Sequence, residues 1–239
     1  MDAFSYTDIF DTKGIEYLIV IGFLILTIPV WIWLNRPLKL KSKARQAAGI
    51  LSERILNIPQ GLMYNHNHTW AFLEKSGLAR IGVDDLLLHL TGGVQIEYLA
   101  NRQEKVKRGE VIARIAQDGK ELKIASPISG EIERVHASLE KQPGMINEDP
   151  YGSGWFFKIR PEKWMEETRS CYVAQDATEW IKKEMSRFKD FITESVNHHL
   201  PEAAPVIMQA GGELIDAPLS EMDGKVWNDF QAKFLDRKE

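Results

Sequence analysis

The sequence predicts an α+β protein in three parts: one membrane-spanning helix, a small β barrel or sandwich, and a helical C-terminal extension. Residues 17–34 read YLIVIGFLILTIPVWIWL, without a single charge. Residues 61–164 consist of short apolar runs separated by turn residues, and residues 165–239 return to apolar residues at helical spacing. Many short strands with one or two short helices are typical of a small barrel or sandwich.

The composition excludes several classes of protein. The chain has 239 residues, of which 27% are charged and 44% hydrophobic, as in an ordinary folded protein. The net charge of -4 gives no indication of nucleic-acid binding. Cys171 is the single cysteine, which excludes an internal disulfide, a Cys-rich zinc site and an iron–sulfur cluster.

The apolar run predicts a transmembrane helix over residues 16–35. Its 18 residues would extend about 27 Å as a helix, close to the hydrocarbon core of about 30 Å. A cleaved signal peptide is the alternative, but it needs a basic start and a small-residue cleavage site. The chain starts with acidic residues, including Asp2 and Asp8, and no such site follows. We therefore expect an uncleaved anchor after a short extracytoplasmic N-terminus at residues 1–15.

The residues after the span predict its orientation. Five basic residues follow within ten positions, with no acidic residue among them: Arg36, Lys39, Lys41, Lys43 and Arg45. Such a cluster stays on the cytoplasmic side. We expect a single-pass protein of the inner (cytoplasmic) membrane with its C-terminal domain in the cytoplasm. Residues 36–60 are predicted to form a basic juxtamembrane stalk helix, or else a helix lying on anionic headgroups.

Within residues 61–164, strands are expected at 71–73, 79–83, 94–98, 111–115, 122–124, 130–135 and 155–159. Asp118–Gly119 is a strong signal for a two-residue hairpin, because glycine tolerates the positive φ of a type I′ turn. A short helix is expected over residues 84–90, with Asp84 near its N-cap.

The extension, residues 165–239, is predicted to hold two helices. Asp176 and Glu179 resemble a capping arrangement at the start of the first, and the second is expected over residues 220–235. A hairpin or loop is expected over 206–217. We expect the aromatic residues of the extension to pack on the preceding domain, because core packing is the more common role of such residues. Docking of a partner is the alternative, and its candidate residues are Trp180, Trp227 and Phe230.

Residues 61–164 resemble the glycine cleavage system H protein. Residues 146–159 read INEDPYGSGWFFKI, and the run INEDPYGxGW is very specific to that family. Residues 68–70 (HTW), 79–85 (ARIGVDD) and 126–132 (SPISGEI) match the family in the same order. The resemblance implies a barrel-sandwich hybrid fold and a lipoyl carrier function, in which lipoate is attached to one lysine at a hairpin tip.

This sequence departs from the family at the functional lysine. With the spacing from Gly109 to Ser126 that the family shows, the matching position is Gly119, and Lys120 follows one residue later. Two alternatives follow. In the first, Lys120 is lipoylated after a one-residue slip; in the second, the carrier function is lost and the tip is a plain Asp-Gly turn. A slip turns the side chain to the other face of the hairpin, which favours loss.

No other constellation indicates catalysis. Residues 65–68 (NHNH) could offer two imidazoles to a metal, but no cysteine or carboxylate lies close by in sequence. The carboxylate pairs Asp84–Asp85 and Glu148–Asp149 are explained by helix capping and turn formation. We expect no metal and no catalytic set.

Two functions remain at this stage. The first is a non-catalytic, membrane-anchored H-like subunit without a cofactor. It would assemble with integral or peripheral subunits of a membrane complex, for which a redox or electron-transfer complex is our expectation. The second is a membrane-tethered lipoyl carrier modified at Lys120.

Overall fold

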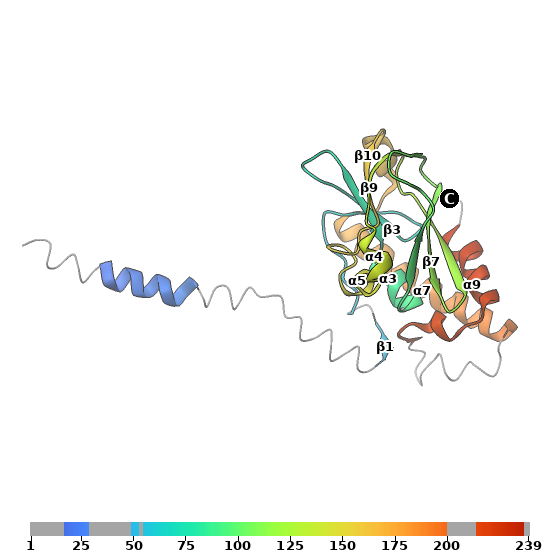
Figure 1. The fold of residues 1–239 in the computed structure, drawn as a ribbon. Helices are drawn as coiled ribbons and strands as arrows, with labels where there is room; N and C mark the ends of the chain where they lie inside the picture. Colours follow the sequence, from blue (N-terminus) through green and yellow to red (C-terminus); the bar gives the residue numbers. More distant parts are fainter. Residues whose placement is uncertain (1–16, 29–48, 53–54, 200–213, 237–239) are drawn as a thin grey trace, which may run out of the picture. The chain divides into compact units, whose positions relative to one another are not determined.

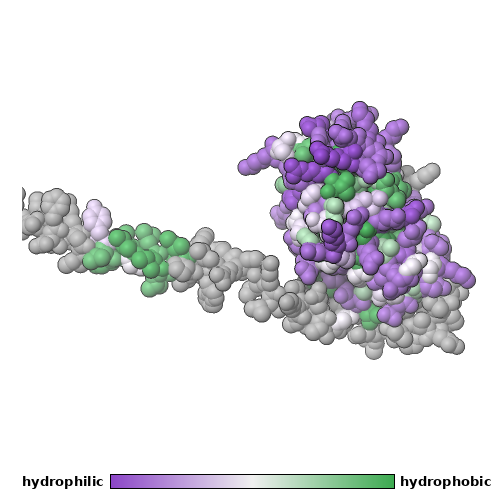
Figure 2. All heavy atoms as spheres, viewed as in Figure 1, coloured by the Kyte–Doolittle hydropathy of each residue, from purple (hydrophilic) through white to green (hydrophobic). Residues whose placement is uncertain are grey.

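The computed structural model describes residues 17–28, 49–52, 55–199 and 214–236, and it divides the chain into two compact units, residues 1–44 and 45–239. In the first unit, residues 17–28 form a helix whose side chains are all exposed. These side chains are almost entirely hydrophobic (Figure 2). Among the described residues, no helix is both long and apolar enough to cross a membrane. The rest of the predicted span, residues 29–35, lies outside the described residues, so the anchor stays a prediction.

The second unit is built on two antiparallel sheets (Figure 1). The larger has six strands in the order β2-β3-β4-β10-β9-β6, and the smaller has three in the order β5-β7-β8. The larger sheet comprises β2 (Met63–Tyr64), β3 (Thr69–Leu73), β4 (Ala79–Val83), β6 (Lys105–Val106), β9 (Gly130–Val135) and β10 (Phe157–Pro161). The smaller comprises β5 (Gln95–Tyr98), β7 (Val111–Gln117) and β8 (Lys120–Ala125). All seven strands that the apolar runs predict are present, within three residues at each end.

Short helices cover the sheets. The predicted helix over 84–90 is confirmed as α3 (Asp85–Thr91), and the Asp84 carboxylate caps it by accepting a hydrogen bond from Leu87 N at 2.8 Å. The remaining short helices of this part are α4 (Ser138–Lys141), α5 (Gly144–Glu148), α6 (Trp164–Glu167) and η1 (Thr168–Ser170).

The family-specific run INEDPYG, residues 146–152, forms the end of α5 and the tight turn that follows it. The Asp149 carboxylate accepts hydrogen bonds from Gly152 N and Ser153 N at 3.0 and 2.9 Å. A Cβ on Gly152 would lie 2.2 Å from Asp149 Oδ2, so only glycine fits there. The Tyr151 hydroxyl accepts a hydrogen bond from Asp85 N at 3.0 Å, which joins this turn to α3.

The extension begins with a long helix, α7 (Ala174–His199), and continues with β11 (Leu214–Ile215), η2 (Pro218–Glu221), α9 (Gly224–Phe230) and the π-helical η3 (Gln231–Leu235). The second predicted helix, over 220–235, is therefore realised as α9 and η3, and it starts at Gly224 because Asp223 caps that end. Of the hairpin or loop predicted over 206–217, residues 206–213 lie outside the described residues.

The stalk is not helical where the structure describes it. Ile50–Leu51 forms strand β1, which pairs antiparallel with β11, in the register Leu51 to Leu214. This corrects the prediction of one helix over residues 36–60 for the described residues 49–52 and 55–60, whereas residues 36–48 and 53–54 lie outside the described part of the chain. Pairing with a strand distant in sequence decides whether this segment is helix or strand. An apolar residue at helical spacing can also pack in a strand when a second strand pairs with it.

The extension shares one hydrophobic core with the sheets. Trp180, Trp227 and Phe230 are 6%, 1% and 0% exposed. They therefore contribute to the packing of this core, and docking of a partner at these residues stays a prediction.

Candidate functional site: the β7–β8 hairpin and its C-terminal cover

The tip of the β7–β8 hairpin is a two-residue turn, as predicted. Asp118 and Gly119 have φ of 48° and 77°, and Gln117 pairs with Lys120 across the ladder. Two consecutive positive φ angles are what a type I′ turn requires, and they suit Asp-Gly. Gly119, the position of the family's lysine, has open space around the point where a Cβ would lie.

The amine of Lys120 is held by the extension. Lys120 Nζ donates hydrogen bonds to Ser220 O at 2.8 Å and to Met222 O at 3.0 Å. It also lies 5.3 Å from the centroid of the Trp227 ring. Carbonyl oxygens and the face of an indole both attract a cation, so each contact stabilises the side chain in this position. Lys120 thus fastens the extension to the hairpin.

A second contact covers the edge of the same hairpin. Strand β8 is the outer strand of its sheet, so part of its backbone has no strand partner. The Gln231 carboxamide takes the place of a strand partner at Lys123. Its Oε1 accepts a hydrogen bond from Lys123 N at 2.7 Å, and its Nε2 donates one to Lys123 O at 3.4 Å. The side chain of one glutamine therefore closes an edge that another chain could otherwise extend.

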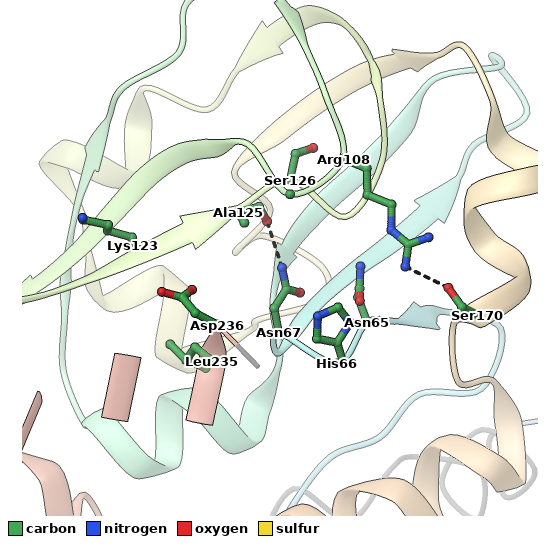
Figure 3. Close-up of a pocket in the computed structure, with 11 residues that line it drawn as sticks. Asn65, His66, Asn67, Arg108, Lys123, Ala125, Ser126, Ser170, Leu235 and Asp236 are labelled. Atoms are coloured by element: carbon green, nitrogen blue, oxygen red, sulfur yellow. Dashed lines mark hydrogen bonds between the residues drawn. The ribbon is translucent and has the colours of Figure 1, made fainter. Parts of the chain in front are cut away.

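An open cavity of about 770 Å³ lies beside the base of the hairpin (Figure 3). Its lining combines amides and cations and includes Asn65, Asn67, Arg108 and Lys123. Asn67 Nδ2 donates to Ala125 O at 3.5 Å, and the Arg108 guanidinium donates to Ser170 Oγ at 2.8 Å. The extension supplies part of the wall, so the cavity is shaped by both parts of the chain.

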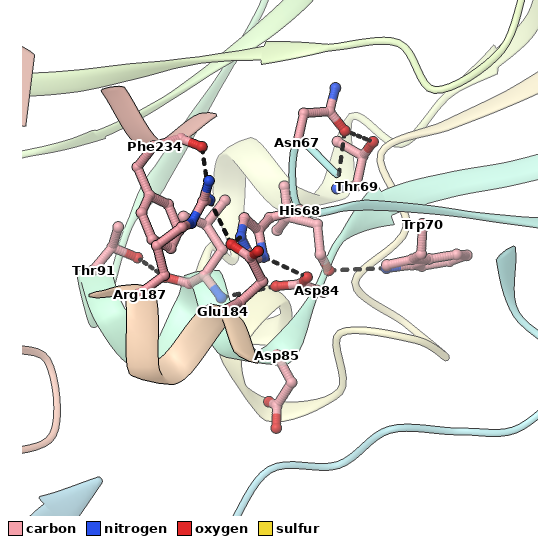
Figure 4. A network of polar contacts seen from close by, with 12 residues as sticks. Asn67, His68, Thr69, Trp70, Asp84, Asp85, Thr91, Glu184, Arg187 and Phe234 are labelled. Atoms are coloured by element: carbon pink, nitrogen blue, oxygen red, sulfur yellow. Dashed lines mark hydrogen bonds and ion pairs between the residues drawn. The ribbon is translucent and has the colours of Figure 1, made fainter. Parts of the chain in front are cut away.

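The end of the β2–β3 loop carries a fully buried imidazole, at His68 (Figure 4). Its Nδ1 lies 2.8 Å from Asp84 Oδ2, and its Nε2 lies 3.5 Å from Glu184 Oε2 on α7. The ring stacks on Trp180 and on Phe234, with centroids 5.1 and 5.3 Å away. His68 thus joins α3 of the domain to α7 and η3 of the extension.

The surroundings of His68 keep it protonated. Burial by itself lowers the pKa of His68, but Asp84 and Glu184 outweigh burial and raise it to about 9. Burial raises the pKa of the Glu184 carboxyl, but His68 and Arg187 lower it by more. The net pKa of Glu184 is therefore below its usual value. The result is a buried imidazolium between two carboxylates.

The structure separates the candidate residues of the sequence into two groups. It brings Lys120 and Trp227 together at the hairpin, whereas Trp180 lies at His68, and Phe230 packs on Phe188 and Phe234. In the described part of the chain, no three His, Cys, Asp or Glu side chains are grouped so that they could hold a metal.

Among the contacts of the extension with the domain that sequence reasoning missed are those of His68 with Glu184, His89 with Asp216, and Gln231 with strand β8. Each joins residues more than 100 positions apart, and no spacing rule connects such residues.

A capped helix, two antiparallel sheets and a β-hairpin with a two-residue turn define an H-protein-like domain. Comparison with known proteins assigns the family: the profile of Glycine cleavage H-protein matches residues 62–184. The chain therefore belongs to the glycine cleavage H-protein family, whose members are carriers rather than enzymes.

Relatives of this family cover the domain and leave much of the chain unmatched. A probable glycine cleavage system H protein of Pyrococcus abyssi is 31% identical over 125 residues, covering 52% of this chain and 92% of the relative. The H protein of Rubrobacter xylanophilus is 37% identical over 103 residues, covering 43% and 81%. A crystal structure of the Mycobacterium marinum H protein aligns with a TM-score of 0.43 at 22% identity, covering 53% of this chain and 98% of that one.

Proposed function

We propose that this protein is a non-catalytic H-like accessory subunit, anchored in the cytoplasmic membrane, that helps to assemble a membrane protein complex. Its hairpin carries no lipoyl group in this proposal. The observation that supports it is the environment of Lys120, whose amine is engaged by two carbonyls and the Trp227 ring. A carrier lysine must reach into solvent and swing between enzymes, whereas this one is used to hold the chain's own extension.

The family position supports the same conclusion. Gly119 stands where the family has its lysine, in a conformation with φ of 77° that glycine adopts without strain. Lys120 follows on strand β8, so its side chain leaves the hairpin in a different direction from one at the tip.

The anchor has a role in this proposal. A carrier that moves between soluble enzymes gains nothing from being tethered, whereas an assembly subunit does, because tethering raises its effective concentration at the membrane. The uncharged run over 17–34 and the basic residues after it support this location.

A second function, a membrane-tethered lipoyl carrier modified at Lys120, is favoured by one specific observation. Lys120 is the first residue after a two-residue turn at the tip of the β7–β8 hairpin, in a chain of the carrier family. For this function the extension would have to release the amine of Lys120.

Intact-mass analysis separates the two. The full chain, purified from cells with active lipoylation, is expected to be unmodified, and the host's own H protein from the same cells is the positive control. A Gly119→Lys variant restores the family position and is expected to gain a lipoyl adduct, which shows that the ligase can use this hairpin. A lipoyl adduct on Lys120 of the unaltered chain would overturn the proposal in favour of the carrier.

A further inference from the structure

The C-terminal segment 214–235, which we call the clasp, covers the hairpin through contacts of two kinds. Lys120 Nζ is bonded to Ser220 O and Met222 O, and the Gln231 side chain is bonded to the backbone of β8 at Lys123. Both contacts depend on the clasp lying in one position, since Ser220 and Gln231 are eleven residues apart in it.

The clasp is also fitted closely to the end of α3. Ala217 N donates to His89 O at 2.8 Å, and Asp216 Oδ1 lies 2.7 Å from His89 Nδ1. A Cβ on Gly92 would lie 2.9 Å from Ala217 Cβ. Ala217 itself has φ of 56°, a left-handed conformation that is unfavourable for a residue with a Cβ and persists only where the surroundings impose it.

The beginning of the clasp is held by residues 49–51, which include strand β1. Strand β1 pairs with β11 through Ile50 with Ile215 and Leu51 with Leu214, and Asp216 N donates to Gly49 O at 2.9 Å. Leu51 and Leu214 are 2% and 0% exposed, so the pair belongs to the core. This two-stranded ribbon immediately precedes the residues that contact α3 and Lys120.

We propose that the clasp is a cover of the Lys120 amine, and that β1 holds this cover closed. Pairing with β1 fixes β11, β11 positions the turn at Ala217, and that turn directs the carbonyls of Ser220 and Met222 onto the amine of Lys120. The segment that leads from the predicted anchor thereby controls access to this amine, while the tip residues Asp118 and Gly119 stay exposed. This inference goes beyond the proposed function, because it concerns exposure of the amine and holds whether or not the amine is ever modified.

Amine acylation of the full chain tests the cover. Lys123 lies on the same strand, is exposed and serves as the internal control. With a succinimidyl ester and peptide mass spectrometry, Lys120 of the unaltered chain is expected to react about tenfold more slowly than Lys123, because its reaction requires local opening of the clasp. Equal rates would overturn the proposal.

A reversible crosslink tests the role of β1. Leu51→Cys and Leu214→Cys, combined with Cys171→Ser, place two thiols at paired positions of the ribbon. In the oxidised form, Lys120 is expected to be protected as in the unaltered chain. In the reduced form, where no disulfide replaces the packing of the two leucines, acylation of Lys120 is expected to be several-fold faster. Acylation of Lys75, an exposed lysine on the β3–β4 turn, is expected to be unchanged.

The two forms share one sequence, so a folding defect common to both is excluded by comparing them. Equal acylation of Lys120 in the oxidised and reduced forms would show that β1 does not hold the clasp. A Leu51→Asp variant gives the same test without a disulfide, and retention of the far-UV circular dichroism spectrum shows that it folds.

Discussion

The His68 site and the Lys120 site both fasten the extension to the H-like domain through a cation, but their surroundings differ. His68 is fully buried between two carboxylates and stacks on two aromatic rings. Lys120 is half-buried and is bonded to neutral carbonyls at 2.8 and 3.0 Å. A buried charge with charged partners is costly to disrupt, whereas a half-buried ammonium can return to water. The first site therefore acts as a permanent joint, and the second as one that can open.

The largest effect is expected from His68→Gln. The neutral amide leaves the buried Asp84 carboxylate without its cation, whereas Glu184 keeps its ion pair with Arg187. We therefore expect the free energy of unfolding to fall by about 3–5 kcal/mol. Urea denaturation measures it. The matched control is His136→Gln, whose imidazole is half-buried, stacks on Trp155 and bonds through Nδ1 to the Trp155 carbonyl. Comparable losses in the two variants would contradict the distinction drawn between the sites.

The next effect is a dependence of stability on pH. The pKa of His68 is raised to about 9 from its usual 6.5, so its contribution is fully present below pH 6.5 and is lost as the pH rises through 9. The expected loss over that interval is roughly 3 kcal/mol, because one pKa unit corresponds to about 1.4 kcal/mol. Unfolding midpoints in urea from pH 6 to 10 measure it. The slope should be clearly smaller in His68→Gln, where His89 remains: burial lowers the pKa of His89, but Asp216 and Asp85 raise it by more. An unchanged slope in that variant would contradict the assignment to His68.

The smallest effect is expected at the hairpin. Lys120→Met removes both hydrogen bonds and the contact with Trp227, and we expect a loss of about 1–2 kcal/mol, since the group is only half-buried. Lys123→Met on the same strand is the control and should change stability by less than about 0.5 kcal/mol. Both are measured by urea denaturation. A loss at Lys120 as large as that at His68 would make the hairpin contact a permanent joint as well.

Local sequence patterns were sufficient for much of the domain. The alternation of apolar residues located the strands, Asp118–Gly119 located the hairpin, and Asp84 located the start of α3. These features depend on neighbours within a few residues, through φ preferences, side-chain alternation and capping. The resemblance to the H-protein family, through the spacing from Gly109 to Ser126, identified Gly119 and Lys120 as the residues that distinguish the two candidate functions.

The sequence by itself thus determined the domain, its family resemblance and the departure at the functional lysine. Only the tertiary structure decided how Lys120 is used, why His68 is charged, and that residues expected in a stalk helix pair as strand β1 with the C-terminal clasp. Apart from the contact of His68 with Asp84, those outcomes depend on contacts between residues 100 or more positions apart. A backbone carbonyl or a carboxylate so distant can be placed next to a lysine or a histidine only by packing of the whole unit.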